Sequence, residues 1–72
     1  MGYVHGKTIK KLESEDGTRQ ADIIARDDGL FQFYEYFLLS DDEGERWTFK
    51  RMSGLYDTAE GAEAVSLAYL KL

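Results

Sequence analysis

Residues 30–39, LFQFYEYFLL, constrain the fold of this chain more than any other stretch. All of them except Gln32 and Glu35 are Phe, Tyr or Leu, and none is Gly or Pro. Aromatic residues favour a pleated backbone that is at least half-buried, so this stretch predicts a central β-strand. Residues 45–53, ERWTFKRMS, supply further large side chains, and the acidic segment between the two stretches predicts a hairpin.

The length of 72 residues leaves room for one domain, which we assign to residues 1–72. A chain of this size buries only about 60% of the surface that its unfolded form exposes, so its stability margin is small. The sequence has no Cys and one His, which excludes disulfides and the usual zinc sites. We expect no metal ion and no cofactor.

The formal net charge of −5 argues against nucleic acid as a partner, because phosphates are bound by basic surfaces. No apolar run approaches the roughly 18 residues that a membrane span needs, and no apolar signal segment opens the chain. We therefore expect a cytoplasmic protein that does not enter a membrane.

Three turn signals divide the first part of the sequence into strands. Residues 15–17, 27–29 and 40–44 combine acidic side chains with Gly, as type I turns followed by a left-handed Gly do. We predict strands at residues 4–14, 19–26, 30–39 and 45–53. Lysines in the first of them suit a sheet edge.

Turn lengths also predict the register of the strands. With two three-residue loops and a final five-residue loop, Ala25 lies opposite Phe31 and Ile23 opposite Phe33. The other expected pairs are Ile9–Ile23, Lys10–Asp22, Glu13–Arg19, Phe37–Trp47 and Glu35–Phe49. One face of the sheet then collects Ile9, Ala21, Ile23, Ala25, Phe31, Phe33, Phe37, Leu39, Trp47 and Phe49. Glu35 lies among them, and we expect Arg51 to pair with it.

Residues 57–60, DTAE, predict the start of a C-terminal helix. Asp57 is the expected N-cap, and Glu60 suits the positive end of the helix dipole. The helix has an apolar stripe of Ala62, Val65, Ala68, Tyr69 and Leu72. We expect this stripe, with Phe37 and Trp47 beneath it, to form the core. The predicted fold is α+β: a four-stranded antiparallel β-meander with one C-terminal helix packed on one face.

One helix covers one face, so the second face needs another explanation. By the same alternation this second face carries Val4, Leu12, Ile24, Leu30, Tyr34, Tyr36, Leu38 and Met52. Monomers rarely expose apolar patches of more than a few hundred Å², which predicts a protein interface here. The predicted interface residues are Ile24, Leu30, Tyr34, Tyr36, Leu38, Met52, Leu67 and Leu70. Alternatively, the N-terminal segment with Tyr3 and Val4 folds over this face.

The sequence carries no legible catalytic set. His5 has no partner motif for acid–base chemistry, and the acidic segment 41–45 lacks the alternating order of a calcium loop. Tyr34 and Tyr36 beside Lys50 have the composition of a stacking platform for single-stranded nucleic acid.

Residues 54–64, GLYDTAEGAEA, resemble a segment found in small uncharacterised bacterial domains. In those domains an antiparallel sheet is followed by a helix. The connecting segment has Tyr or Phe, then Asp, then Ser or Thr, any residue, Glu, any residue and Ala. The resemblance implies a sheet-plus-helix fold and no catalytic residues.

These observations favour a non-enzymatic protein-interaction module or small accessory subunit, most simply a homodimer. We expect a homo-oligomer or another protein as the partner, and no small molecule. The alternative is a sheet that binds single-stranded nucleic acid through Tyr34, Tyr36 and Lys50. An enzyme ranks third, since it would need residues from a second subunit.

Overall fold

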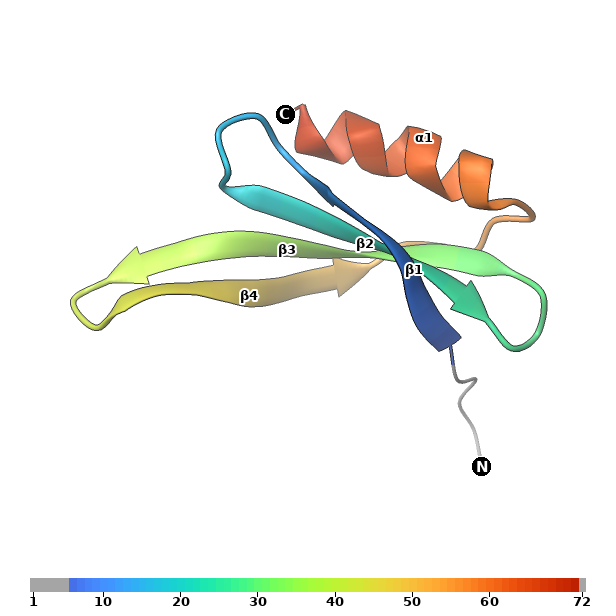
Figure 1. Cartoon of the computed structure of the whole chain (residues 1–72), viewed down its shortest axis with the longest axis horizontal. Coiled ribbons are helices and arrows are strands. Elements are labelled where there is room, and N and C mark those ends of the chain that lie inside the picture. Colours follow the sequence, from blue (N-terminus) through green and yellow to red (C-terminus); the bar gives the residue numbers. More distant parts are fainter. Residues whose placement is uncertain (1–5, 72) are drawn as a thin grey trace.

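The computed structural model describes residues 6–71, which form one antiparallel sheet and one helix (Figure 1). The strands lie in the order β1-β2-β3-β4. They are β1 (Gly6–Glu13), β2 (Arg19–Arg26), β3 (Phe31–Asp41) and β4 (Gly44–Met52), followed by α1 (Ala59–Leu70). The predicted α+β meander is confirmed. The expectations for Tyr3, Val4, His5 and Leu72 lie outside the described residues.

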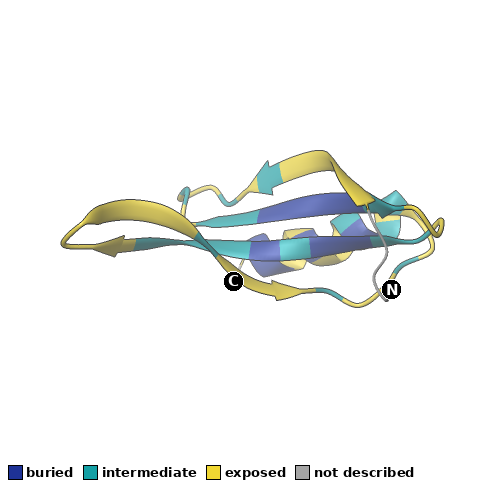
Figure 2. Cartoon of the chain, turned by 90° about the horizontal axis from the view of Figure 1, so that it is seen from below, coloured by how far each residue is buried: buried dark blue, intermediate teal, exposed yellow. Residues whose placement is uncertain are grey.

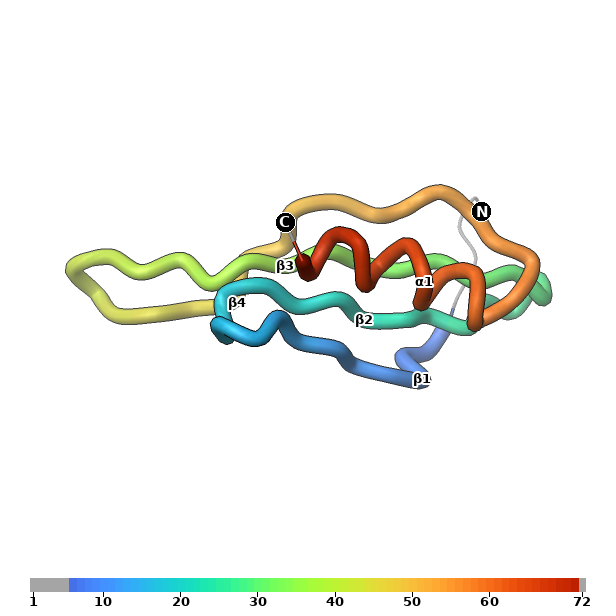
Figure 3. Tube along the Cα trace, turned by 90° about the horizontal axis from the view of Figure 1, so that it is seen from above, coloured from blue at the N-terminus to red at the C-terminus, as the bar shows by residue number. Residues whose placement is uncertain are grey.

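The helix lies on one side of the sheet, over β2 and β3 (Figure 3). Seen from the opposite side, the sheet is in front and the helix behind it (Figure 2). We call these two sides of the sheet the helix side and the open side. Beyond the C-terminal end of α1, β3 and β4 continue as a two-stranded arm (Figures 1 and 3).

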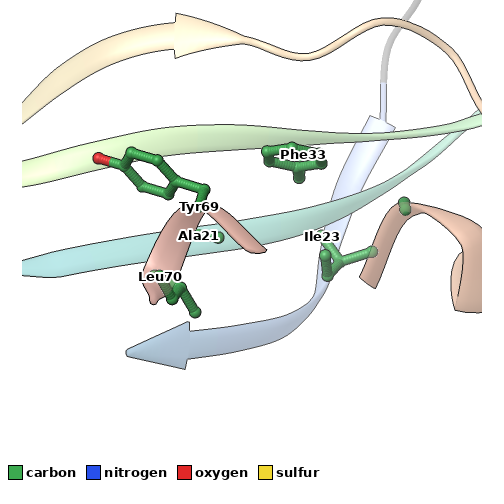
Figure 4. Close-up of a cluster of buried hydrophobic side chains, with 6 residues drawn as sticks. Ala21, Ile23, Phe33, Tyr69 and Leu70 are labelled. Atoms are coloured by element: carbon green, nitrogen blue, oxygen red, sulfur yellow. The ribbon is translucent and has the colours of Figure 1, made fainter. Parts of the chain in front are cut away.

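The core forms where β2 and β3 meet the helix. Their register is the predicted one, with Ala25 opposite Phe31 and Ile23 opposite Phe33. Because directly opposed residues point to the same side of a sheet, these side chains gather beneath the helix. The buried cluster consists of Ala21, Ile23, Phe33, Ala62, Tyr69 and Leu70 (Figure 4).

The pairing of β1 with β2 differs from the prediction by one residue next to the turn. Thr18 joins the turn: its N–H and hydroxyl both donate to Asp16, and Ser14 donates to the same carboxylate. These hydrogen bonds, the one from Ser14 above all, hold the pKa of Asp16 at about 2. Because Thr18 is bound to the Asp16 side chain in this way, the turn has one residue more than the predicted three-residue loop.

The longer turn changes the partners of the residues that follow it. Lys11 rather than Lys10 lies opposite Asp22, and Glu13 faces Gln20 instead of Arg19. Leu12 moves to the helix side and packs against the core. A bulge at Ile9 then restores the predicted register, and it leaves Ile9 exposed instead of opposite Ile23.

The β3–β4 hairpin also departs from the prediction, with larger consequences. Asp41 pairs with Gly44, so the turn has two residues and not five, and the Asp41 side chain accepts a hydrogen bond from the N–H of Glu43. Phe37 therefore lies opposite Thr48, and Leu38 opposite Trp47. A shift of one residue turns a strand over. The predictions that Trp47 and Phe49 belong to the core and pair with Phe37 and Glu35 are wrong.

A bulge in β4 shifts the register by one further residue, which returns the residues after it to their predicted side of the sheet. The register changes between Glu35 and Tyr36, which pair with Arg51 and Phe49, so Lys50 is the extra residue. Arg51 returns to the helix side, where its Nε lies 2.9 Å from Oε1 of Glu35. The predicted pairing of these two charges is confirmed.

The buried stripe of α1 is rotated relative to the prediction. It consists of Ala62, Ser66, Tyr69 and Leu70, whereas Val65 and Ala68 are exposed. Ser66 is buried at little cost, because its hydroxyl donates to the backbone C=O of Glu63 within the helix. Tyr69 fixes the helix to the sheet through a 3.0 Å hydrogen bond from its hydroxyl to the backbone C=O of Tyr36.

Thr58, and not Asp57, is the N-cap of α1. Its backbone is extended, and its hydroxyl oxygen accepts a hydrogen bond from the N–H of Gly61 at 3.0 Å. Asp and Thr are both good capping residues, so composition alone could not choose between the two neighbours.

Replacing Phe33 by Ala should unfold most of the protein. The side chain is 2% exposed and lies at the centre of the core, and such a truncation costs about 3–5 kcal/mol. Total stabilities of small domains are of similar size. Thermal unfolding followed by circular dichroism tests this, and a midpoint within a few degrees of the parent would contradict the core assignment.

Thr58→Ala should destabilise the protein by about 0.5–2 kcal/mol, because it removes the cap of α1. Asp57→Ala is the matched control, and it should cost less because Asp57 does not hold the Gly61 N–H. Urea unfolding of both variants measures the difference. A larger loss for Asp57→Ala would assign the cap to Asp57.

Candidate functional site

The open side of the sheet carries a row of large apolar side chains along β3 and β4. We call it the aromatic stripe; its members are Tyr34, Tyr36, Leu38, Trp47, Phe49 and Met52. Trp47, Phe49 and Met52 are 41%, 50% and 58% exposed, and the three residues from β3 are half-buried. No part of the chain between residues 6 and 71 forms a layer over this side (Figure 2).

The pleat of the hairpin aligns the stripe. Tyr36 lies opposite Phe49, Leu38 opposite Trp47 and, past the bulge, Tyr34 opposite Met52. The Phe49 ring meets the rings of Tyr34 and Tyr36 edge-on, with centroids 5.9 and 5.7 Å away. Such edge-to-face pairs hold aromatic side chains in defined positions. The stripe is therefore an ordered surface.

Polar side chains border the stripe on the β2 side. Gln20 donates to Asp22 at 2.9 Å, and Arg26 donates to Gln32 at 3.0 Å. Asp22 and Gln32 are themselves buried, so these contacts satisfy groups that water does not reach. An apolar centre with a polar border is the usual arrangement of protein–protein interfaces.

Only part of the predicted interface comes together in the structure. Tyr34, Tyr36, Leu38 and Met52 form the stripe as expected. Ile24 is only 5% exposed and Leu30 is half-buried just before β3, so both offer little surface. Leu67 is exposed on the helix, away from the stripe. Leu70 is buried in the core and cannot serve as an interface residue.

Trp47 and Phe49 are the stripe residues that the sequence prediction missed. A five-residue turn places them in the core, and the two-residue turn places them on the open side. The signal that could have revealed this is Asp41: an Asp whose side chain bonds the N–H two residues later favours a tight turn starting at that residue.

Lys50 does not accompany Tyr34 and Tyr36. The β4 bulge turns Lys50 to the helix side, where its Nζ lies 5.2 Å from the centre of the Tyr69 ring. The three residues of the predicted nucleic-acid platform are thus divided between the two sides of the sheet.

A second candidate is a surface groove of about 340 Å³ on the helix side, between α1 and the segment that follows β4. Phe33, Tyr56 and Tyr69 line it, with Glu35 and Arg51 at one end. Glu35 is only 1% exposed, and Arg51 already provides its counter-charge at 2.9 Å. The same contact raises the pKa of Arg51. The groove therefore contains a satisfied ion pair rather than a charge that awaits a ligand.

Residues 6–71 contain no group of three potential metal-binding side chains. In the same part of the chain, no helix has the length and apolar character needed to cross a membrane. His5, the single His of the sequence, lies outside the described residues.

Comparison of the chain with models of protein families, with curated proteins and with solved structures finds no match.

Phe49→Ala should reduce the stability of the isolated chain by about 1–2 kcal/mol. The side chain is half exposed, so the loss comes mainly from two edge-to-face pairs, each worth about 0.5–1.5 kcal/mol. Urea unfolding at low protein concentration measures it. A loss as large as that of Phe33→Ala would mean that Phe49 belongs to the core.

Proposed function

We propose that the protein is a non-enzymatic protein-interaction module whose aromatic stripe is the interface, with a second copy of the chain as the first candidate partner. The observation that carries the proposal is the exposure of Trp47, Phe49 and Met52 in one continuous row with Tyr34 and Tyr36. Isolated apolar residues are common on protein surfaces, but contiguous rows mark sites of association.

The residue types of the stripe support this reading. Tyr, Trp, Phe and Met are the side chains most enriched in protein interfaces, and the stripe consists of these four types and one Leu. Charged residues, which interface centres exclude, are absent from the row. Burial raises the pKa of the Tyr36 phenol, because the low-dielectric surroundings disfavour its charged form.

The size of the open side also supports it. The molecule measures 41 × 29 × 17 Å, and the side seen in Figure 2 spans the first and last of these extents. The rectangle that bounds this side has an area of roughly 700 Å², of the same order as the approximately 800 Å² of accessible surface that each partner contributes to a standard interface. Two copies stacked through this side would bury the whole stripe.

Single-stranded nucleic acid fits the open side less well. Stacking platforms for bases combine aromatic rings with nearby cations. Here Lys50 points to the other side, Asp22 and Glu45 occupy open-side positions, and the net charge is −5. Binding of a random single-stranded oligonucleotide that weakens steeply with salt would contradict the proposal.

Sedimentation equilibrium of the parent and of Tyr34→Lys tests the proposed interface. The parent should have a mass of at least twice 8.3 kDa at high micromolar concentration, and Tyr34→Lys should lower it, because a charge within a desolvated aromatic row opposes burial. Val65→Lys is the matched control: it changes an exposed apolar residue on the helix and should leave the mass unchanged. A monomeric parent, or equal masses for the parent and Tyr34→Lys, would reject the proposal.

A further inference from the structure

The outer edge of β4 is open for backbone pairing. β4 is the last strand of the sheet, and β3 is its only neighbour among residues 6–71. An edge strand presents a row of unpaired N–H and C=O groups that can pair with another strand. From Gly44 to Phe49 the strand is regular, and the bulge comes only at Lys50.

The register identifies which backbone groups point outward. Asp41 and Gly44 close a two-residue turn and are therefore a hydrogen-bonded pair. Hydrogen-bonded and non-hydrogen-bonded pairs alternate along an antiparallel ladder. Gly44, Arg46 and Thr48 thus direct their N–H and C=O groups to β3. Glu45, Trp47 and Phe49 direct theirs away from the sheet.

Charge along β4 is divided between its two ends. The turn end carries the acidic residues Asp41, Asp42, Glu43 and Glu45, and only Arg46 offsets them there, through its pair with Asp41. The other end carries Lys50 and Arg51. When two copies of such a strand lie antiparallel, the acidic end of each meets the basic end of the other. The two ends are therefore complementary in charge, and Arg46 opposite Lys50 is the like-charge contact of an antiparallel pair centred on Thr48.

The opposite edge of the sheet carries features that oppose strand pairing. β1 carries Lys7, Lys10 and Lys11 within its eight residues, and a bulge at Ile9 interrupts its middle. Lysines and bulges are the features by which natural sheets prevent pairing at an edge.

We propose that β4 pairs with β4 of a second copy, antiparallel about a two-fold axis at Thr48. This register places Trp47 opposite Phe49 of the second copy, and both residues have their backbone groups directed outward, as a hydrogen-bonded pair requires. Their side chains lie on the same side of the joined sheet, where they form aromatic cross-strand pairs at both ends of the axis. The proposal uses the edge rather than the open side, so it does not depend on the proposed function.

Amide hydrogen exchange tests the edge directly. In an unpaired chain the N–H groups of Trp47 and Phe49 exchange freely, whereas those of Arg46 and Thr48 are protected by β3. Edge pairing should slow the exchange of Trp47 and Phe49 by about tenfold or more as the protein concentration rises from micromolar to millimolar. Unprotected exchange of both amides at millimolar concentration would overturn the proposal.

A proline variant provides the second test, in the Tyr34→Lys chain so that the aromatic stripe is disabled. Glu45→Pro removes one outward N–H and places a ring on the edge, a position where Pro is tolerated in a sheet. Asp42→Pro is the control, because Pro is favoured at the first central position of a type I turn and leaves the outer edge intact. Tyr34→Lys alone and with Asp42→Pro should have twice the mass of 8.3 kDa, and Tyr34→Lys with Glu45→Pro should be monomeric.

The outcomes separate the two surfaces. A monomeric Tyr34→Lys chain would overturn edge pairing and support the stripe as the sole interface. A Tyr34→Lys chain with the parent mass would reject the stripe, and dissociation by Glu45→Pro would then still support the edge. Equal masses for the Glu45→Pro and Asp42→Pro chains would overturn edge pairing.

Discussion

The two-residue turn between β3 and β4 is the constraint on which the rest of this structure depends. Because side chains alternate along a strand, the length of this turn decides whether Trp47 and Phe49 lie under the helix or on the open side. The turn puts them on the open side, and the core is then built without them, from Ile23, Phe33, Tyr69, Leu70 and two alanines. A small core and a large exposed stripe are therefore two results of one local event.

The two β-bulges have complementary effects on the sheet. The bulge at Lys50 adds a second one-residue shift to that of the turn, which returns Arg51 to the helix side, where it reaches the buried carboxylate of Glu35, while Phe49 stays on the open side. A buried carboxylate without a counter-charge would be costly, so this second shift is needed for the fold. The bulge at Ile9 brings β1 back into the predicted register and makes its edge unsuitable for pairing.

The core and the aromatic stripe use alternate residues of the hairpin. Phe33 and Glu35 of β3 point to the helix and hold the domain together, whereas Tyr34 and Tyr36 point away from it. The arm carries this division past the end of α1, where its helix side also lacks a helix above it (Figure 3). A surface built on a strand of the core is rigid, since its backbone is fixed by the packing on the other side.

The sequence by itself determined the element order, the β2–β3 register, the Glu35–Arg51 pair and four residues of the stripe, because hydrophobic alternation and Asp-Gly turn signals are local. Only the tertiary structure decided the faces of Trp47 and Phe49, the buried positions of Leu70 and Ser66, and the cap at Thr58. Each of these features depends on a change of one residue position. The change lies in the register of β3 with β4, in the buried stripe of α1 or in the residue that caps the helix. Several neighbouring shifts suit the sequence about equally well; the turn at Asp41 selects the one that sets the faces of Trp47 and Phe49, and the packing of the helix against the sheet selects the rotation of α1.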